Sequence, residues 1–386
     1  MKKLSLFLAA TLILTMLSSC TGYAQEILAT LTSGNGHTQS IPVLMDFEAF
    51  TPHFNEEYIV LEKSPDEDFI VLNLTDPQLD TNEWDEDDIE RKILEYTIDE
   101  LIKKTQPDLI TISGDLSWGK NCHKSYKMFA ELLEKYDIPW APVWGNHDNE
   151  DGVYVVDSIE KLYSRYENCI YKEGEPELGS GNYVISIEEN GTPITAIFMI
   201  DSHDHDTYID ANGNEYEDYS KLNDEQINWY KLRAESLKSL GYQDSAIVLH
   251  IPIHGYRTAF NAAFNSEYDS TSISWEESYD DKYWNAGYEN SSGLNNEGIW
   301  SSPVEDGMRE LIENIGNTKC IIAGHDHKNN FIINYNDVYY VYGLKTGMGC
   351  YWDQKLNGGT IVRISSNGIE EVYHEYINVD HILNAQ

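Results

Sequence analysis

From about residue 68 onward, short apolar runs alternate along the chain with segments whose apolar residues recur at helical spacing. The run DFIVLNLTD (68–76) has the length of a buried strand, and in the next segment, 85–104, the apolar residues keep to one helical face. Alternating strands and helices predict an α/β fold whose early strands are parallel. Further strands are predicted at 107–115, 138–148, 245–254 and 318–327, and further helices at 125–136, 223–240 and 304–314.

Later strands are predicted to pair as antiparallel neighbours. The pair Asn190-Gly191 interrupts the apolar run 183–201, and Asn367-Gly368 interrupts the run 360–373. An Asn-Gly pair between two strand-like runs favours a tight hairpin turn. With 331–343, these runs predict hairpins beside the parallel strands.

Two regions fall outside this pattern. Residues 20–60 are loosely patterned and are predicted to form a tether with a strand or two. Residues 255–300 are aromatic and polar without clear periodicity, which is typical of a functional or mobile insertion. The rest predicts one domain over 61–380 with 255–300 inserted in it.

The first residues resemble a leader for export. Residues 1–19 combine the basic start MKK with the apolar run LSLFLAATLILTML, and LSSC ends at Cys20. The LSSC sequence is similar to a bacterial lipobox, so we expect a signal peptide over 1–19 and a lipid anchor at Cys20, in the cell envelope. The alternative is cleavage after Ala24, which would give a secreted protein. Either way, we expect the protein to be exported.

The charge of the chain restricts its partners. There are 26 basic and 66 acidic residues, a formal net charge of −40. Such an excess of negative charge disfavours binding to nucleic acid backbones or to anionic lipid surfaces, so we expect a membrane contact only through the anchor. A phosphorylated small molecule remains a suitable partner if cations in the site screen its approach.

The cysteines carry no metal-binding pattern. Apart from Cys20 there are four, scattered without a CxxC pair, so a zinc knuckle is disfavoured. Disulfides and buried free thiols both remain open for them. They are Cys122, Cys169, Cys320 and Cys350.

Polar residues able to bind a metal follow five of the predicted strands. One such residue at a strand end is usually a helix cap or a hydrogen-bonded core histidine, but five groups are hard to explain in this way. Ligands of α/β proteins gather beyond the carboxyl ends of the strands, so we expect these side chains to form one site. They are Asp76 and Gln78, Asp115, Asn146 and His147, His250, and His325 and His327.

The donors suit divalent metal ions of borderline hardness, namely Mn, Fe, Zn or Mg. There are too many of them for one tetrahedral ion, and none is a cysteine, which disfavours a structural zinc. Such a set is typical of two ions that share a carboxylate in a hydrolase and activate a bridging hydroxide for attack on phosphorus.

The ordered motifs D-x-Q, GD, GNHD, H and GHDH resemble those of the calcineurin-like metallophosphoesterases, over roughly residues 68–350. WAPVWGNHD, HIPIH and AGHDHKNNF are similar to motifs of the branch related to purple acid phosphatases. The resemblance implies a four-layer α/β/β/α sandwich of two mixed β-sheets flanked by helices. It also implies a phosphatase, a metal-dependent phosphoric ester hydrolase.

The resemblance implies a role for each residue. His147 would face the substrate and protonate the leaving oxygen, with Asp148 orienting its imidazole. The ligands would divide into Asp76, Gln78 and His327 for the first metal, and Asn146, His250 and His325 for the second, with Asp115 bridging both.

Two positions depart from the family pattern. Gln78 stands where most members have histidine; its neutral oxygen favours Mn²⁺, Mg²⁺ or Fe²⁺, with Mn²⁺ preferred, or else Gln78 only orients a water. Trp118 stands where purple acid phosphatases carry a tyrosine that binds ferric iron. Indole has no such lone pair, so we expect a colourless protein.

Other candidates are less specific. His254 suits either a leaving-group contact or a hydrogen-bonded loop residue, and Arg257 and Lys345 are candidate phosphate contacts because cations are scarce. The histidines His203 and His205 in DSHDHD imitate a metal site, but a solvated loop is the better interpretation.

Two alternatives to a phosphatase remain. One is a phosphodiesterase that acts on nucleotides or lipid headgroups. The other is a non-catalytic surface lipoprotein that keeps the fold in order to bind a ligand.

Overall fold

The computed structural model of the chain describes residues 58–79, 88–119, 123–149, 155–264, 284–288 and 290–385. The predicted leader, the proposed anchor at Cys20 and nearly all of the predicted tether lie outside these residues, as do residues 265–283 and 289 of the predicted insertion. Among the described residues, no helix is long and apolar enough to cross a membrane.

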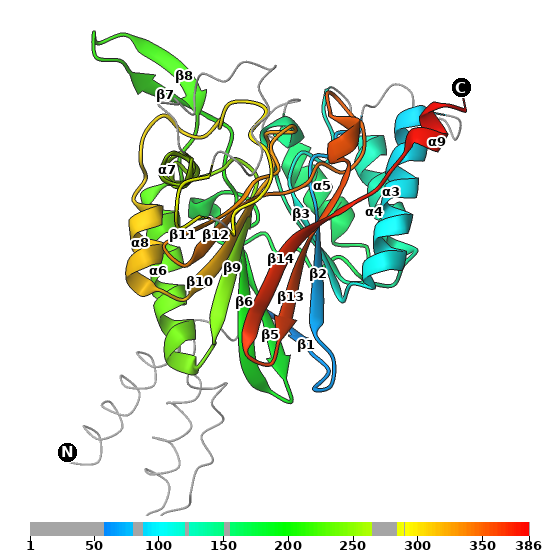
Figure 1. Ribbon diagram of the computed structural model, residues 1–386, viewed down its shortest axis with the longest axis horizontal. Helices are drawn as coiled ribbons and strands as arrows, with labels where there is room; N and C mark the ends of the chain where they lie inside the picture. Colours follow the sequence, from blue (N-terminus) through cyan, green and yellow to red (C-terminus); the bar gives the residue numbers. More distant parts are fainter. Residues whose placement is uncertain are drawn as a thin grey trace, which may run out of the picture. The chain divides into compact units, whose positions relative to one another are not determined.

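Two large mixed sheets form the centre of the domain (Figure 1). Within the described residues, the larger sheet has seven strands in the order β1-β5-β6-β9-β10-β12-β11, and the smaller has five in the order β14-β13-β2-β3-β4. The first six strands of the chain are β1 (Tyr58–Glu62), β2 (Phe69–Leu74), β3 (Leu109–Ser113), β4 (Trp140–Val143), β5 (Tyr183–Glu189) and β6 (Thr192–Met199). The other strands of these sheets are β9 (Asp244–Leu249), β10 (Thr318–Ala323), β11 (Ile332–Tyr335), β12 (Val338–Tyr342), β13 (Gly358–Ser365) and β14 (Gly368–Tyr376).

Within each sheet, the strands that carry the candidate site run parallel to one another. In the smaller sheet β2 pairs with β3 and β3 with β4, and in the larger sheet β9 pairs with β6 and β10, all in parallel. The predicted hairpins are antiparallel: β5 with β6, β11 with β12, and β13 with β14. The carboxyl ends of neighbouring parallel strands therefore meet at one edge of each sheet.

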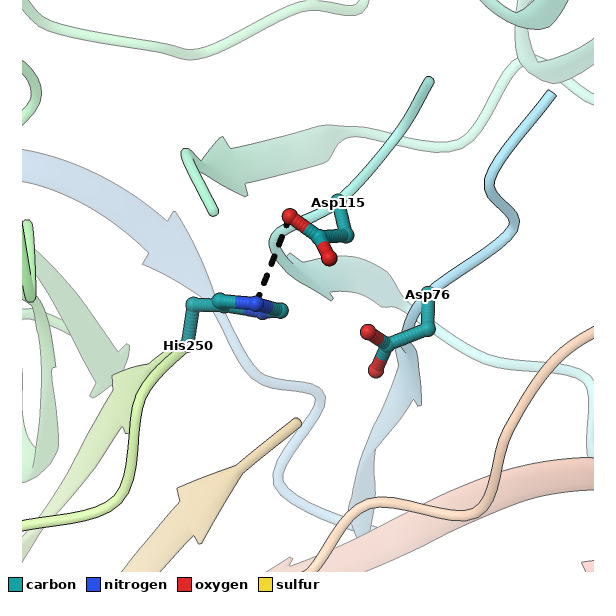
Figure 2. A group of neighbouring side chains, drawn as sticks. All are labelled: Asp76, Asp115 and His250. Atoms are coloured by element: carbon teal, nitrogen blue, oxygen red, sulfur yellow. Dashed lines mark ion pairs between the residues drawn. The ribbon is translucent and has the colours of Figure 1, made fainter. Parts of the chain in front are cut away.

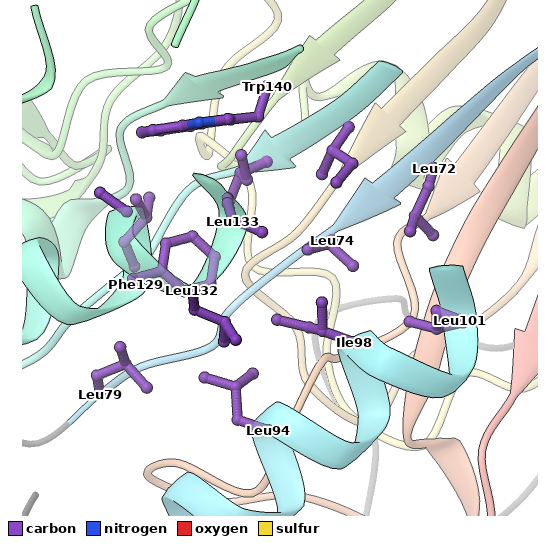
Figure 3. Close-up of a cluster of buried hydrophobic side chains, with 14 of the residues drawn as sticks. Leu72, Leu74, Leu79, Leu94, Ile98, Leu101, Phe129, Leu132, Leu133 and Trp140 are labelled. Carbon is purple, nitrogen blue, oxygen red and sulfur yellow. The ribbon is translucent and has the colours of Figure 1, made fainter. Parts of the chain in front are cut away.

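The sheets are buried on both faces, which explains why their strands read as continuous apolar runs. In β2, Phe69 and Val71 pack between the sheets against residues such as Ile185 and Val248. Leu72 and Leu74 of β2 point the other way, into a core with the neighbouring helices (Figure 3). This alternation follows from the two-residue period of a strand.

Helices cover the outer face of each sheet (Figure 1). On the larger sheet, the ring of Phe198 packs edge-on against Tyr230 of α6, with ring centres 5.1 Å apart. The predicted fold class, two mixed sheets flanked by helices, is therefore confirmed. The helices beside the smaller sheet are α3 (Ile89–Thr105), α4 (His123–Glu134), α5 (Val155–Tyr163) and α9 (Asp380–Leu383); those beside the larger are α6 (Asp224–Leu240), α7 (Gly255–Ala263) and α8 (Met308–Ile315).

The structure adds elements that the sequence pattern did not predict. The first nine residues of the predicted insertion form α7, and the DSHDHD segment leads into a separate hairpin of β7 (His205–Ile209) and β8 (Glu215–Tyr219). The cysteines Cys169, Cys320 and Cys350 are free thiols, which excludes a disulfide among these three. Cys122 lies outside the described residues.

Candidate metal centre

The candidate site lies beyond the carboxyl ends of five strands from both sheets. β2, β3, β4, β9 and β10 each end within three residues of a predicted ligand. Each buried strand ends where the chain leaves the hydrophobic core, and the polar residues directly after it lie at that edge of the sheet. The residues in question are, in chain order, Asp76, Asp115, Asn146, His250 and His325.

The backbone at several of these residues is left-handed, a conformation that costs free energy for a residue other than glycine. The φ angle is 50° at Asp76, 43° at Gln78, 51° at Asp115 and 77° at His325. Strained backbone of this kind is typical of functional sites, where the surrounding structure holds side chains in directions that regular strands do not allow.

Glycines allow the ligand segments to approach one another closely. A Cβ atom on Gly145 would lie 2.1 Å from Asp115 Oδ1, and one on Gly324 would lie 2.7 Å from Asp76 Oδ2. A Cβ on Gly114 would lie 2.7 Å from the imidazole of His250. The GD, GNHD and GHDH motifs therefore need glycine because larger residues would displace the aspartates or the histidine.

Three of the candidate ligands form a compact buried group, drawn in Figure 2. One ligand atom each from Asp76, Asp115 and His250 lie within 4.8 Å of one another. His250 Nδ1 donates to the carbonyl of Ser113 at 2.9 Å, which leaves Nε2 facing Asp115 Oδ1 at 3.3 Å. A tautomer fixed in this way is typical of a histidine that presents its other nitrogen to a metal.

His325 and Asn146 face the same nitrogen of His250. His250 Nε2 lies 3.1 Å from Asn146 Oδ1 and 3.3 Å from His325 Nδ1. These three side chains are the predicted ligands of the second metal, and the structure brings them together next to Asp115.

His327 lies on the other side of the site. Its Nδ1 donates to the carbonyl of Tyr351 at 2.7 Å, and its Nε2 lies 3.3 Å from Asp76 Oδ1. The two histidines of GHDH therefore face different partners, His325 facing His250 and His327 facing Asp76. Asp326 between them points into the fold, where its Oδ2 accepts from Trp300 N–H at 3.1 Å.

Gln78 and Lys345 lie beside Asp76 and Asp115. The Gln78 amide donates from Nε2 to Asp115 Oδ2 at 2.9 Å, and its Oε1 lies 3.4 Å from Lys345 Nζ. Lys345 is buried, and its ammonium donates to the carbonyl of Asp76 at 2.6 Å. These internal hydrogen bonds hold the Asp76–Gln78 turn, and the suggested phosphate contact of Lys345 stays a prediction.

The protonation of the site reflects its buried carboxylates. Burial alone would raise the pKa of Asp76, but its electrostatic interaction with the neighbouring His327 imidazole outweighs burial and lowers this pKa to about 2. Burial would lower the pKa of His250, but the neighbouring Asp115 carboxylate raises it to about 10. Burial, together with the charge of His250, lowers the pKa of His325 to about 3. The two carboxylates therefore hold their negative charge and favour a cation beside them.

The donor set fits a bound metal ion. Among the described residues, the buried Asp76 Oδ1 accepts no hydrogen bond of normal geometry, although buried polar atoms nearly always do; His327 Nε2 faces it at 3.3 Å. Carboxylate, amide and imidazole donors at this point match divalent ions of borderline hardness. Asp76 and His327 would hold one ion, and Asn146, His250 and His325 a second, with Asp115 between them. Gln78 lies beside the first ion's ligands, and its own role as a ligand stays a prediction.

His147 and Asp148 follow directly in the same turn. The His147 side chain is 30% exposed, and its Nε2 lies 3.9 Å from Asp115 Oδ2. The buried Asp148 carboxylate accepts from Gly145 N–H at 2.8 Å and from Tyr126 O–H at 2.7 Å. Asp148 therefore positions His147 through the backbone of the turn, and its contact with the imidazole itself stays a prediction.

The two predicted substrate contacts lie at the start of α7: His254 directly precedes the helix and Arg257 lies in its first turn. His254 pairs through Nδ1 with the carboxylate of Glu305. Arg257 donates to the carbonyls of Ile299 at 3.1 Å and Ser301 at 2.9 Å. Arg257 thus holds the loop that precedes α8 by hydrogen bonds. Contact of His254 or Arg257 with a substrate stays a prediction.

The DSHDHD segment is hydrogen-bonded rather than fully solvated. His203 Nε2 lies 2.7 Å from Gln226 Oε1, while the exposed His205 packs against the ring of Tyr219. Tyr219 in turn meets the ring of His325 edge-on, with ring centres 4.4 Å apart. The segment therefore reaches the site through Tyr219 and not through its own histidines.

Three residues that support the ligands were not predicted from the sequence. Tyr219 contacts His325, Tyr351 contacts His327, and Glu297 accepts a hydrogen bond from Tyr351. No motif marks them, because they come from segments far from the ligands along the chain. Their proximity to the site is a tertiary property.

Comparison with known proteins identifies the family. A family model described as calcineurin-like phosphoesterase matches residues 69–329. The chain belongs to the calcineurin-like phosphoesterase family. The family resemblance predicted from the five motifs is therefore confirmed.

The related sequences are named as purple acid phosphatases. A probable inactive purple acid phosphatase 28 of Arabidopsis thaliana is 24% identical over 275 residues, 65% of this chain and 61% of that protein. A probable inactive purple acid phosphatase 14 of the same plant is 27% identical over 256 residues, 60% of this chain and 56% of that protein. The chain thus spans about three fifths of the length of these relatives.

Solved structures with a similar chain trace include two that are named as phosphatases. A dimetal phosphatase from Danio rerio aligns with 81% of this chain and 99% of its own, with 12% identity and a TM-score of 0.49. A purple acid phosphatase from yellow lupin seeds aligns with 82% of this chain and 55% of its own, with 11% identity and a TM-score of 0.41.

Proposed function

We propose that this calcineurin-like phosphoesterase is a phosphatase, a metal-dependent phosphoric ester hydrolase with two divalent metal ions. The observation that carries the proposal is the convergence of buried carboxylate, amide and imidazole donors from five strand ends beside the accessible His147. A small phosphorylated molecule or another phosphoester is the substrate class that this chemistry fits.

The metal ions, when bound, would supply Lewis acidity and an activated water at neutral pH. The chain's own residues set where this happens. Asp115 lies between Asp76 and His250. Gly145 beside Asp115 and Gly324 beside Asp76 have no side chain, so the segments that carry the ligands can approach one another closely. We favour manganese because the donors are mainly oxygen and imidazole, with no thiolate.

His147 is the proposed acid. Its main-chain N–H donates to Asp115 Oδ1 at 2.9 Å, so the residue is fixed against the centre while its imidazole remains accessible. A proton on the imidazole can then pass to the leaving oxygen of the ester as its bond to phosphorus breaks. In the protonated form the same imidazole stabilises negative charge on the phosphoryl oxygens.

A comparison of two chromogenic esters tests the proposal. We expect protein reconstituted with Mn²⁺ to release nitrophenol from mono-(nitrophenyl) phosphate faster than from bis-(nitrophenyl) phosphate. The reverse preference would favour a phosphodiesterase. The word "inactive" in the names of the relatives points to a non-catalytic binding protein as the other alternative. If metal-loaded protein hydrolyses neither ester and no member of a wider panel of phosphoesters, the result favours that alternative.

We also propose that the protein is exported to the cell envelope and anchored by a lipid at Cys20. The support is the LSSC sequence after the basic and apolar leader, with secretion after cleavage at Ala24 as the alternative. Contact with nucleic acid backbones is not expected for a chain with a net charge of −40.

A further inference from the structure

The segment 294–300, at the end of the predicted insertion, runs along the residues that follow the GHDH motif. Leu294 N–H donates to Asn330 Oδ1 at 2.7 Å, and Asn330 N–H donates back to the Leu294 carbonyl at 3.0 Å. Glu297 N–H donates to Asn329 Oδ1 at 3.1 Å. These hydrogen bonds fix the segment directly behind the turn that carries the candidate ligand His327.

The Glu297 carboxylate contacts two residues beside His327: Lys328, which follows it in the chain, and Tyr351, which packs on its ring. The side chain is buried, with 2% of the residue exposed. Its Oε1 accepts from Lys328 N–H at 2.6 Å, and its Oε2 accepts from Tyr351 O–H at 3.1 Å. One carboxylate therefore ties the residue after His327 to a tyrosine from a different loop.

Tyr351 in turn defines the orientation of the His327 imidazole. The two rings are stacked, with centres 4.0 Å apart and planes at 24°. The Tyr351 carbonyl accepts from His327 Nδ1 at 2.7 Å, so that Nε2 is left to face Asp76 Oδ1 at 3.3 Å. The Lys328 ammonium lies 5.7 Å from the centre of the tyrosine ring and packs on it as well.

We propose that Glu297 is a positioning residue for the metal ligand His327 and acts through Tyr351. Without the carboxylate, the Tyr351 ring and carbonyl lose the contact that fixes them against the imidazole. His327 Nε2 would then be held less firmly toward Asp76. Partners behind a ligand contribute to metal affinity because they fix its tautomer and direction. The inference rests on the proposed metal centre but needs no substrate.

The test is a calorimetric titration of metal-free protein with Mn²⁺. The variant His327→Ala first identifies which binding step belongs to the Asp76 side. We expect Glu297→Leu, which removes both acceptors at similar volume, to weaken that same step about 10- to 100-fold. Tyr351→Phe, which keeps the ring and the carbonyl but loses the O–H, should weaken it in the same direction. The step assigned to Asn146, His250 and His325 should be unchanged.

Two further variants make the outcome decisive. Glu297→Gln retains an acceptor for Lys328 N–H and can pair with the tyrosine oxygen, so it should bind within about threefold of wild type. Glu371→Leu, which removes a carboxylate paired with Arg363 on the distant β13–β14 hairpin, should alter neither step. The inference is overturned if Glu297→Leu leaves the His327 step unchanged, or if it weakens both steps equally. Because the readout is metal binding, a failure of the proposed hydrolysis would appear separately, as metal-loaded protein without turnover.

Discussion

At the scale of single residues, the candidate metal centre depends on glycines beside the ligands as well as on the ligands themselves. Gly145 has ordinary backbone angles, yet a Cβ there would lie 2.1 Å from Asp115 Oδ1 and 2.5 Å from Asp115 N. The first is a carboxylate oxygen held by the His147 N–H and the second is a main-chain nitrogen, so the neighbouring turn has to move. The residue is glycine for reasons of space and not of backbone freedom.

We therefore predict that Gly145→Ala displaces Asp115 and lowers Mn²⁺ affinity at least about tenfold, in line with the cost of disturbing the surroundings of a metal ligand. Calorimetric titration of the metal-free variant measures this. Gly241→Ala is the matched control. Its φ is 98° and no atom lies within 4 Å of the added Cβ, so it should cost about 1 kcal/mol of stability and leave metal affinity unchanged. Wild-type affinity in Gly145→Ala would contradict the steric argument.

His147 allows catalysis to be separated from metal binding. We predict that His147→Asn lowers kcat for a phosphomonoester by about 10²- to 10⁴-fold, the usual contribution of a general acid, because no proton reaches the leaving oxygen. Metal stoichiometry should stay at the wild-type value, since His147 contacts Asp115 through its main chain. Steady-state kinetics and metal analysis of the same preparation provide both numbers. A variant with full activity would remove His147 from the mechanism.

At the scale of secondary-structure elements, the buried strands were predictable and the exposed hairpin of β7 and β8 was not. The strands β2, β3, β9 and β10 are apolar on both faces, so their sequences are unmistakable. The hairpin of β7 and β8 is exposed and acidic, and its residues resemble a solvated loop. Helix α7 was missed although its buried residues Tyr256, Ala259, Phe260 and Ala263 recur at helical spacing, because it begins a long aromatic and polar region in which this pattern does not continue.

The hairpin of β13 and β14 carries a histidine that should make stability depend on pH. His374 lies on β14, with Nδ1 3.0 Å from Thr360 Oγ1 and Nε2 2.9 Å from the Asn330 carbonyl. Burial lowers its pKa from 6.5 to about 4, and the hydrogen bond to Asn330 only partly opposes this. Between pH 4 and 6.5 the unfolded chain binds more protons at this site than the folded chain does, so stability falls as the pH falls through this window.

We predict that His374→Gln removes up to about 3 kcal/mol of this pH dependence between pH 6.5 and 4. The measurement is the free energy of unfolding by urea across that range, in metal-free protein for both variants. A slope equal to that of wild type would show that the charge of His374 is not linked to folding.

At the scale of the whole molecule, the buried aspartates link metal binding to stability. We predict that Mn²⁺ at about 1,000 times its dissociation constant stabilises the fold by about 4 kcal/mol per ion, and that a chelator reverses this. Scanning calorimetry with and without chelator measures the change. Because a chain of net charge −40 is also sensitive to ionic strength, the control replaces Mn²⁺ by NaCl of equal ionic strength. Equal melting temperatures in Mn²⁺ and NaCl would contradict a metal held by the native fold.

The proposed anchor is tested on the full chain. We predict that Cys20→Ser moves the protein from the membrane fraction to the soluble exported fraction in a bacterial host, because the thioether-linked lipid can no longer form. Fractionation and immunoblotting measure this, with Cys350→Ser as the matched control that should remain with the membrane. A wild-type protein found entirely in the soluble exported fraction would favour cleavage after Ala24.

Local patterns along the chain were enough to predict the fold class and the family, because strands buried on both faces and motifs at strand ends are local properties of the chain. They also identified the residues from Asp76 to His327 that converge on one site, since parallel strands bring their carboxyl ends together. The contacts around these residues are visible only in the tertiary structure: the burial of Lys345, the hydrogen bond of Gln78 to Asp115, and the support of His327 by Glu297 and Tyr351. Such contacts join segments far apart in the chain, and their distances depend on how the sheets, helices and loops pack, which no local pattern encodes.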